Sequence, residues 1–201
     1  MPLNNKMQKD PAPNSTLLDR MKSTSKGSSD NFQTPPEGID YLLEGLAKGG
    51  KPLSKNKVIW DPCAGEGQVV EYFESNGYKA FGTDINDGTD FLSDLYWNVR
   101  FEHPKNTTID WDVIITNPPY SLKDQFLSRC YSLQKPFALL LPITALGGKK
   151  RLKMYQEHGM QLILPPKRIN FKTPSGKKSS NWFYTAWFTH GFDLNKEIVY
   201  V

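Results

Sequence analysis

Apolar and polar positions follow two different periods along this chain, and their order predicts the fold. Continuous or alternating apolar runs predict strands, which we place at Val58–Asp61, Ala80–Asp84, Asp112–Thr116, Phe137–Leu141, Leu162–Leu164 and Phe183–Phe188. Apolar residues three and four positions apart predict helices, which we place at Val69–Ser75, Leu122–Leu133 and Lys149–Glu157. Strands that alternate with helices predict one doubly wound α/β domain, with a mostly parallel sheet and helices on both faces.

One more helix is predicted ahead of the first strand. Thr34 and Glu37 have the spacing of a capping box around two prolines, so we expect Thr34 to be the N-cap. Apolar residues at helical spacing follow, and a glycine pair ends the helix: Ile39, Leu42, Leu43, Leu46 and Gly49-Gly50. The segment Met1–Ser29 is polar and lacks aromatic residues, which predicts a flexible tail ahead of a domain spanning residues 30–201.

The composition favours a single soluble domain in the cytoplasm. With 201 residues, 38% of them hydrophobic, the chain has enough apolar material for one well-buried core but not comfortably for two domains. Cys63 and Cys130 give no disulfide framework, and three scattered histidines give no metal-ligand spacing, so we expect reduced thiols and no metal. The longest apolar stretch, Phe137–Leu146, is too short to cross a bilayer, and no signal-peptide pattern is present.

The net charge of +4 is unevenly distributed. Between Ile143 and Trp182, basic residues far outnumber the one acid, Glu157. They are Lys149, Lys150, Arg151, Lys153, Lys167, Arg168, Lys172, Lys177 and Lys178. A local excess of this kind indicates a polyanionic partner, although a solvated surface of an ordinary basic protein explains the segment equally well when it is considered alone.

The first chemical motif follows the first predicted strand. Asp61-Pro-Cys-Ala-Gly-Glu-Gly67 places a glycine-rich turn between a strand and a helix, where the backbone can approach a ligand closely. The next predicted strand ends in Asp84, at the position where an acid typically binds both ribose hydroxyls. The third glycine of the dinucleotide fingerprint is missing, so a nucleoside without a pyrophosphate, such as S-adenosylmethionine, fits better than NAD.

The most informative stretch is Asn117-Pro118-Pro119-Tyr120, directly after a buried strand. A ring-bound amine is a poor nucleophile because its lone pair is delocalised, and two acceptors at its N–H groups would polarise it. The Asn117 side-chain oxygen and the Pro118 carbonyl can supply those acceptors. Pro119 stiffens the loop, and Tyr120 offers a flat face for an extruded base. No strong general base is required, because the methyl donor is an already activated sulfonium and correct positioning does most of the chemistry.

Together these motifs resemble the S-adenosylmethionine-dependent amino-methyltransferases that act on N6 of adenine in DNA. The matching stretches are D-P-C-A-G-E-G at 61–67, T-D-I at 83–85 and N-P-P-Y at 117–120. Upstream, Asp30–Pro35 is similar to the cofactor-binding TP motif in the order of the gamma group. The resemblance covers about residues 30 to 190 and implies the Rossmann-like methyltransferase fold of the seven-stranded type.

The resemblance also implies roles for individual residues. The implied cofactor contacts are Phe32, Thr34, Asp61, Ala64, Gly65, Gly67, Asp84, Ile85, Asp90 and Phe91. Within that set, Asp84 holds the ribose, Ile85 packs on the cofactor adenine, and Asp90 binds the adenine amine. The implied catalytic residues are Asn117, Pro118, Pro119 and Tyr120.

Family members that read a defined sequence carry a sizeable target-recognition domain, for which this chain has no room. Only the insertions Asn86–Asp110 and Pro165–Asn181 could serve that purpose. We therefore expect short or relaxed sequence specificity, as in compact enzymes of phages and mobile elements. The basic loop Pro165–Trp182, with Phe171, and the lysines and arginine at 149–151 are expected to contact DNA phosphates. Trp182 is expected to be core at the start of a strand.

Two alternatives remain open at this point. The acceptor could be an RNA adenine, because a flipped base looks the same to the pocket, or N4 of cytosine, although those enzymes usually carry Ser or Asp where Asn117 stands. Release-factor glutamine enzymes share N-P-P-Y but typically have a G-x-G-x-G turn, which is missing here. The second alternative is a catalytically silent module that binds nucleic acid or a protein through the basic loop.

Overall fold

The computed structural model describes residues 32–93, 101–103, 107–171 and 183–201, with the backbone alone for 101–103 and 107–109. The predicted tail Met1–Ser29 and residues 172–182 of the basic loop, with Lys172, Lys177, Lys178 and Trp182 among them, lie outside the described residues. Within the described part of the chain, no helix has the length and apolar character needed to cross a membrane.

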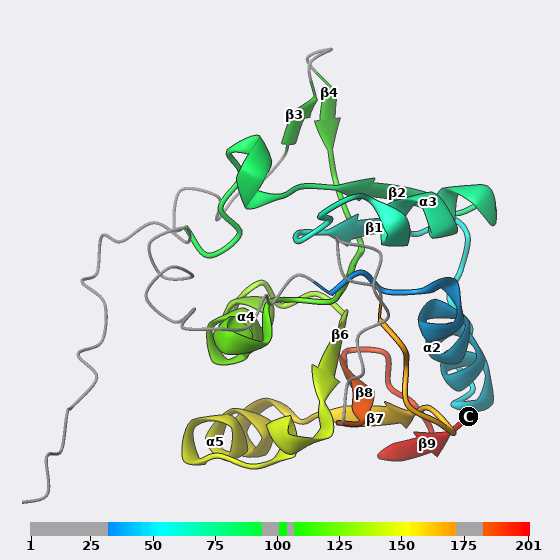
Figure 1. Ribbon diagram of the computed structural model, residues 1–201, viewed down its shortest axis with the longest axis vertical. Coiled ribbons are helices and arrows are strands. Elements are labelled where there is room, and N and C mark those ends of the chain that lie inside the picture. Colours follow the sequence, from blue (N-terminus) through cyan, green and yellow to red (C-terminus); the bar gives the residue numbers. More distant parts are fainter. Residues whose placement is uncertain (1–31, 94–100, 104–106, 172–182) are drawn as a thin grey trace, which may run out of the picture.

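The described strands and helices alternate along most of the chain (Figure 1). The strands are β1 (Val58–Asp61), β2 (Lys79–Gly82), β3 (Phe101–His103), β4 (Thr107–Ile109), β5 (Val113–Thr116), β6 (Phe137–Pro142), β7 (Gln161–Leu164), β8 (Thr185–His190) and β9 (Ile198–Tyr200). The helices are α2 (Pro36–Lys48), α3 (Gln68–Ser75), α4 (Lys123–Ser132) and α5 (Lys149–His158), with short 3₁₀ helices η1 (Ile85–Asp87), η3 (Tyr120–Leu122) and η4 (Ile143–Leu146).

Seven of the described strands form one sheet in the order β2-β1-β5-β6-β8-β7-β9. The pairs β1–β2, β1–β5, β5–β6 and β7–β9 are parallel, whereas β8 runs antiparallel to both β6 and β7. The predicted doubly wound, mostly parallel sheet is therefore confirmed. Because β2, β1, β5 and β6 are parallel, their carboxyl ends meet at one edge, where ligands bind in such sheets.

Alternate residues of each central strand face different helices, as the two-residue period of a strand requires. Trp60 and Ile114 belong to the core beneath α4 and α5, whereas Ile59, Val113 and Ile115 belong to the core beneath α2 and α3. All four residues of β5 are buried, as expected for a strand covered on both faces. Figure 1 shows α4 and α5 on one side of the sheet and α2 on the other.

The predicted capping box at the start of α2 is wrong. The helix begins at Pro36, and Pro35 occupies the N-cap position in an extended conformation, because a residue that precedes proline avoids the helical region. The Thr34 hydroxyl is buried and caps nothing. Glu37 instead accepts a hydrogen bond from the Tyr41 hydroxyl at 2.8 Å and pairs with Lys167 at 2.7 Å.

Several strand boundaries also differ from the prediction. β8 begins at Thr185 rather than Phe183, because Thr185 pairs with Pro142, the last residue of β6. β2 ends at Gly82, so Asp84 lies beyond the strand and caps η1. The three-residue strands β3, β4 and β9 carried no periodic signal. The first two form a hairpin that projects away from the main sheet, within the predicted insertion Asn86–Asp110 (Figure 1).

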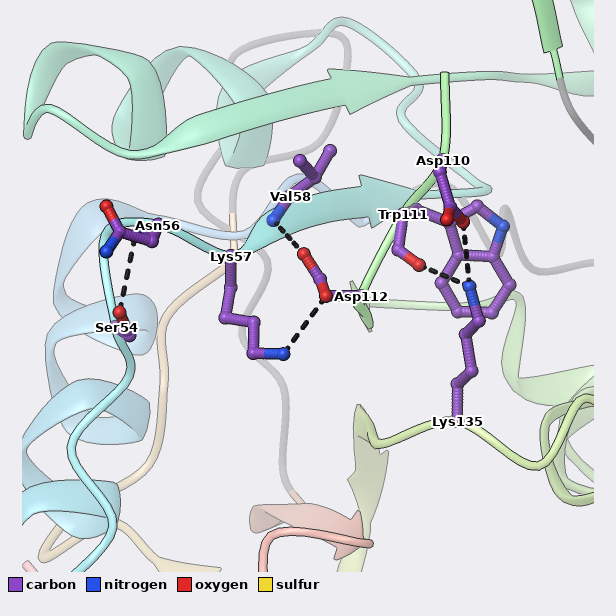
Figure 2. A network of polar contacts seen from close by, with 8 residues as sticks. All are labelled: Ser54, Asn56, Lys57, Val58, Asp110, Trp111, Asp112 and Lys135. Atoms are coloured by element: carbon purple, nitrogen blue, oxygen red, sulfur yellow. Dashed lines mark hydrogen bonds and ion pairs between the residues drawn. The ribbon is translucent and has the colours of Figure 1, made fainter. Parts of the chain in front are cut away.

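Ion pairs fix the amino ends of β1, β5 and β6 (Figure 2). Asp112, just before β5, accepts hydrogen bonds from the Val58 backbone N–H at 2.8 Å and from the Lys57 ammonium at 3.0 Å. Lys135, just before β6, contacts the Asp110 carboxylate and the Trp111 carbonyl, and its ammonium lies 4.2 Å from the centre of the Trp111 ring. At this edge of the sheet, the charged side chains hold β1, β5 and β6 in register.

Candidate active site

A cleft lies at the opposite edge, where β1, β2 and β5 end. Its empty volume, open mouth included, is about 770 Å³. It is lined by Phe32, Gln33, Thr34, Asp61, Pro62, Cys63, Ala64, Gly65, Gln68, Val69, Asp84, Ile85, Asn86, Asn117 and Pro119. The segment ahead of α2 thus closes over residues that follow three different strands.

Asp61, the last residue of β1, is almost completely buried in this cleft, with 1% of its surface exposed. One carboxylate oxygen accepts the Cys63 backbone N–H at 3.0 Å. Burial raises the pKa of Asp61 to about 6, against opposing effects of Thr116 and the Cys63 N–H, while the nearby charge of Asp84 adds to the rise. Ionised Asp61 therefore lacks much of the stabilisation that water gives a carboxylate.

The turn after β1 has a shape that only glycine allows at two positions. Gly65 and Gly67 have φ of 53° and 87°, in the left-handed region that other residues rarely adopt. A Cβ on Gly65 would also lie 3.2 Å from the Gln33 side-chain nitrogen. Gln68 follows as the first residue of α3; its amide nitrogen donates to Glu66 at 2.9 Å, and its buried oxygen has no hydrogen-bond partner among the described residues. The turn leaves an open cradle with an unused acceptor.

Asp84 connects the glycine turn after β1 to the start of η1. One of its oxygens accepts the Gly65 backbone N–H at 3.0 Å, and the other accepts the Asn86 backbone N–H at 2.9 Å and the Asn86 side-chain amide at 2.7 Å. A carboxylate offers about four lone-pair positions. Binding two ribose hydroxyls here, as predicted, therefore requires the Asn86 amide to move away.

Asn117 lies directly after β5 and has one used and one unused polar atom. Its side-chain nitrogen donates to the Phe32 carbonyl at 2.8 Å. Because a carbonyl can only accept, the amide nitrogen must face Phe32 and the amide oxygen must face away. That oxygen is buried and has no hydrogen-bond partner in the described part of the chain. Such an orphaned acceptor costs free energy unless a ligand satisfies it.

Aromatic rings surround the loop that follows Asn117. The Tyr120 ring lies 5.7 Å from the Phe32 ring and 5.8 Å from the Phe183 ring, measured between centroids. Phe171 lies 5.7 Å from Phe32, but it is buried in the core with 1% exposure. Our placement of Phe171 in a DNA-contacting loop is therefore wrong: Ile169 and Phe171 alternate inward and pack against the sheet.

Most of the predicted cofactor residues come together in the cleft. Those that line it are Phe32, Thr34, Asp61, Ala64, Gly65, Asp84 and Ile85, together with Asn117 and Pro119 of the predicted catalytic set. Phe91 does not line it: its side chain is 2% exposed and stacks on Phe126 in the core. Asp90 accepts the Leu92 backbone N–H, and Gly67, Pro118 and Tyr120 also lie outside the lining.

Six lining residues had no predicted role: Gln33, Pro62, Cys63, Gln68, Val69 and Asn86. Gln33, Pro62 and Cys63 lie within the predicted motifs, so proximity in sequence was the available signal. Gln68 and Asn86 carry side-chain amides that sequence spacing alone does not orient. Cys63 is half-buried, and burial raises its pKa well above the usual range, so its thiol is protonated.

The predicted phosphate-binding residues divide into two groups. Lys149 and Lys150 are exposed in the first turn of α5, and Arg168 is exposed beside the Tyr184 ring. Arg151 is instead engaged within the protein: its guanidinium donates to the Ala145 and Gly147 carbonyls and pairs with Asp124. Lys167 pairs with Glu37, which raises the pKa of Lys167. A phosphate contact by either residue would compete with these bonds.

The cleft has the charge of a site for a cationic ligand. Asp61 and Asp84 line it, and no lysine or arginine is among its described lining residues. The described residues also contain no group of three or more side chains able to hold a metal ion. A polyphosphate would meet two carboxylates here without a compensating cation, whereas a ligand with a sulfonium and an ammonium is complementary.

No family model and no curated protein sequence matches this chain. Its fold is similar to that of a protein from Listeria monocytogenes described as a class I S-adenosylmethionine-dependent methyltransferase, with a TM-score of 0.50 and 17% identity, covering 92% of this chain and 70% of that one. With the sheet order above, this likeness confirms the predicted Rossmann-like methyltransferase fold.

Two further structures match over most of this chain. One is described as a modification subunit of a type I restriction enzyme from Vibrio vulnificus (TM-score 0.49, 16% identity, 90% of this chain covered). This chain spans about half, 48%, of that subunit's length. The other is described as an RNA methyltransferase from Pyrococcus horikoshii (TM-score 0.48, 16% identity, 82% of this chain and 88% of that one).

Proposed function

We propose that this protein transfers a methyl group from S-adenosylmethionine to the exocyclic N6 amine of adenine in DNA, with short or relaxed sequence specificity. The observation that supports this proposal most directly is the buried, unpartnered amide oxygen of Asn117. It lies in the same cleft as the carboxylates and the glycine cradle. A ring-bound NH₂ group is a donor that such an acceptor can satisfy.

The residues of the cleft fit the proposed cofactor. When bound, S-adenosylmethionine supplies a methyl group already activated on a positively charged sulfur. Asp61 and the turn at Gly65 would hold its methionine end, and Asp84 would accept the ribose hydroxyls once Asn86 releases its oxygen. The buried hydroxyl of Thr34 and the side-chain oxygen of Gln68 have no hydrogen-bond partner in the described ranges, and they could contact the ligand's ammonium or hydroxyl groups.

The chain's own residues would position and polarise the acceptor amine. The Phe32 carbonyl fixes the Asn117 amide so that its oxygen needs no reorientation when the amine arrives. Pro118 and Pro119 have no backbone N–H to compete for that oxygen, and the Pro118 carbonyl would accept the second amine hydrogen. As the nitrogen gains the methyl group it loses one proton to solvent, so the site needs no strong base.

The aromatic rings and exposed cations support a nucleic-acid substrate. Tyr120, Phe32 and Phe183 present rings beside the Asn117 corner, and an extruded base can stack on such surfaces. Lys149, Lys150 and Arg168 are exposed cations that could contact phosphates. The choice of DNA and of adenine rests on the resemblance of N-P-P-Y and its neighbouring motifs.

Transfer of a labelled methyl group tests the proposal. The protein is incubated with labelled S-adenosylmethionine and, in parallel, with single-stranded DNA, duplex DNA, RNA and a glutamine peptide, followed by analysis of nucleosides or residues. We expect label in N6-methyladenine from DNA. Label only in RNA, in N4-methylcytosine or in the peptide would overturn the substrate assignment, and absence of transfer with intact DNA binding would indicate the catalytically silent module.

A further inference from the structure

An exposed tyrosine lies next to the proposed base pocket. Tyr184 has 56% of its surface exposed, and the Arg168 guanidinium lies 5.9 Å from the centre of its ring. The ring of its chain neighbour Phe183 lies 5.8 Å from the Tyr120 ring and 6.4 Å from the Phe32 ring, measured between centroids. Phe183 thus packs among the rings near Asn117, whereas Tyr184 is exposed beside a cation.

The backbone places Tyr184 at the same edge of the sheet as Asn117. The Tyr184 carbonyl accepts the Ile143 backbone N–H at 2.9 Å, and the next residue, Thr185, pairs with Pro142 at the end of β6. β6 is the neighbour of β5, whose end bears Asn117. Beyond Ile143, η4 leads to the exposed lysines at the start of α5. Tyr184 therefore lies at the edge of the sheet that bears Asn117, with Arg168 beside it and exposed lysines following η4.

We propose that Tyr184 and Arg168 form a platform for the nucleotide adjacent to the acceptor adenine in the same strand, an inference that rests on the proposed function. The ring would stack on the neighbouring base, and the guanidinium would contact the phosphate that joins the two nucleotides. Stacking on an exposed ring beside a cation binds any base with little sequence preference. A chain without a large recognition domain could hold an unpaired strand in this way.

The experiment compares two exposed tyrosines. Tyr184→Ala is matched by Tyr200→Ala, since Tyr200 is 71% exposed on β9, the edge strand farthest from β2. Binding of an adenine-containing single-stranded oligonucleotide is measured by anisotropy, and methyl transfer at saturating cofactor gives kcat and KM. We expect Tyr184→Ala to raise Kd and KM about tenfold, with kcat within about twofold. Tyr184→Phe should retain wild-type affinity, and Tyr200→Ala should have no effect.

The DNA provides the second arm. A single abasic residue is placed in turn at each position on either side of the adenine. At one adjacent position it should weaken DNA binding by the wild type about tenfold, whereas binding by Tyr184→Ala should weaken scarcely further. Arg168→Ala should weaken binding and lower its salt dependence, which Lys48→Ala should not. Equal behaviour of the two tyrosine variants, or equal effects of every abasic site on wild type and Tyr184→Ala, would overturn the platform alone. A wild-type protein that methylates none of the DNA substrates overturns the proposed function and the platform together.

Discussion

Charged side chains at the two ends of the parallel strands lie in opposite environments. At the amino ends, Asp112 is 36% exposed and accepts two hydrogen bonds, and the Val58 N–H is the main reason that its pKa lies below the usual range (Figure 2). At the carboxyl ends, Asp61 is 1% exposed, and burial raises its pKa to about 6. The first carboxylate is stabilised by the fold, whereas the second is a cost to it.

The same contrast extends to uncharged groups. Within the part of the chain that the structure describes, the cleft holds three buried polar atoms without hydrogen-bond partners, on Thr34, Gln68 and Asn117, and each such atom costs about 1–3 kcal/mol. In the network of Figure 2, Asp112 and Lys135 each have more than one partner. Polar groups that serve the fold are paired within it, and those left unpaired in a cleft indicate where a ligand completes the structure. This contrast yields four predictions.

The largest effect is expected for Asn117. Asn117→Ala removes the orphaned acceptor, so methyl transfer in single turnover should fall by about 10²–10³-fold, while cofactor affinity measured by calorimetry changes little. The control is Asn56→Ala, an exposed amide at the amino edge whose substitution should leave transfer unchanged. Full activity of the Asn117 variant would remove the central residue from the proposed mechanism.

The second prediction exchanges the two carboxylates for amides of the same shape. At pH 8, Asp61→Asn should raise the free energy of unfolding, because it removes a buried charge, and should weaken cofactor binding about tenfold or more. Asp112→Asn should do the reverse, lowering the free energy of unfolding while leaving cofactor affinity intact. Denaturant unfolding followed by tryptophan fluorescence, together with calorimetry, measures both. Equal destabilisation by the two substitutions would contradict the comparison.

The third prediction concerns pH. Asp61 has a folded pKa of about 6 against an ordinary value of 3.8, so the folded protein holds the proton more tightly. Its contribution to stability is therefore present below pH 3.8 and is lost as pH rises through about 6. The pKa of Asp112 is lowered, so its contribution is present above 3.8 and lost at lower pH.

Cofactor binding should show the Asp61 titration directly. A cationic ligand favours the ionised carboxylate, so its affinity should fall up to about tenfold per pH unit below pH 6. Asp61→Asn should flatten this dependence, and Asp112→Asn should not. An unchanged pH profile in the Asp61 variant would show that another group controls binding.

Sequence was sufficient for the parts of the site that depend on order along the chain. Asp61 and Asp84 end predicted strands and Asn117 follows one, and parallel strands bring such positions to one edge. The glycine turn was predictable because the residue type itself reports the backbone conformation, as the positive φ of Gly65 and Gly67 shows. The two periods of apolar residues predicted the mostly parallel sheet with helices on both faces.

Sequence was insufficient where a side chain has a choice of partners across loops. Arg151 and Lys167 resemble the other cations of the basic segment, yet Asp124 and Glu37 approach them only in the folded chain. Phe171 is an aromatic residue in a basic stretch, and only the packing on Phe32 and the sheet shows that it is core. In each case the partner of the side chain depends on which residues the folded chain brings together, and the local sequence pattern does not indicate that.

The smallest effect is expected for Asn86, and it concerns how fully the carboxyl edge is prepared for its ligand. The Asn86 amide donates to the Asp84 oxygen that a ribose hydroxyl would need, so Asn86→Ala should leave cofactor affinity unchanged or raise it by about twofold to fivefold. Asp84→Asn should weaken binding, because it removes the acceptor itself. At the amino edge, the equivalent removal of a donor, Lys57→Ala beside Asp112, should gain nothing and only lower stability. If Asn86→Ala instead weakens binding as much as Asp84→Asn, the amide is a ligand contact and the cleft needs no rearrangement at this point.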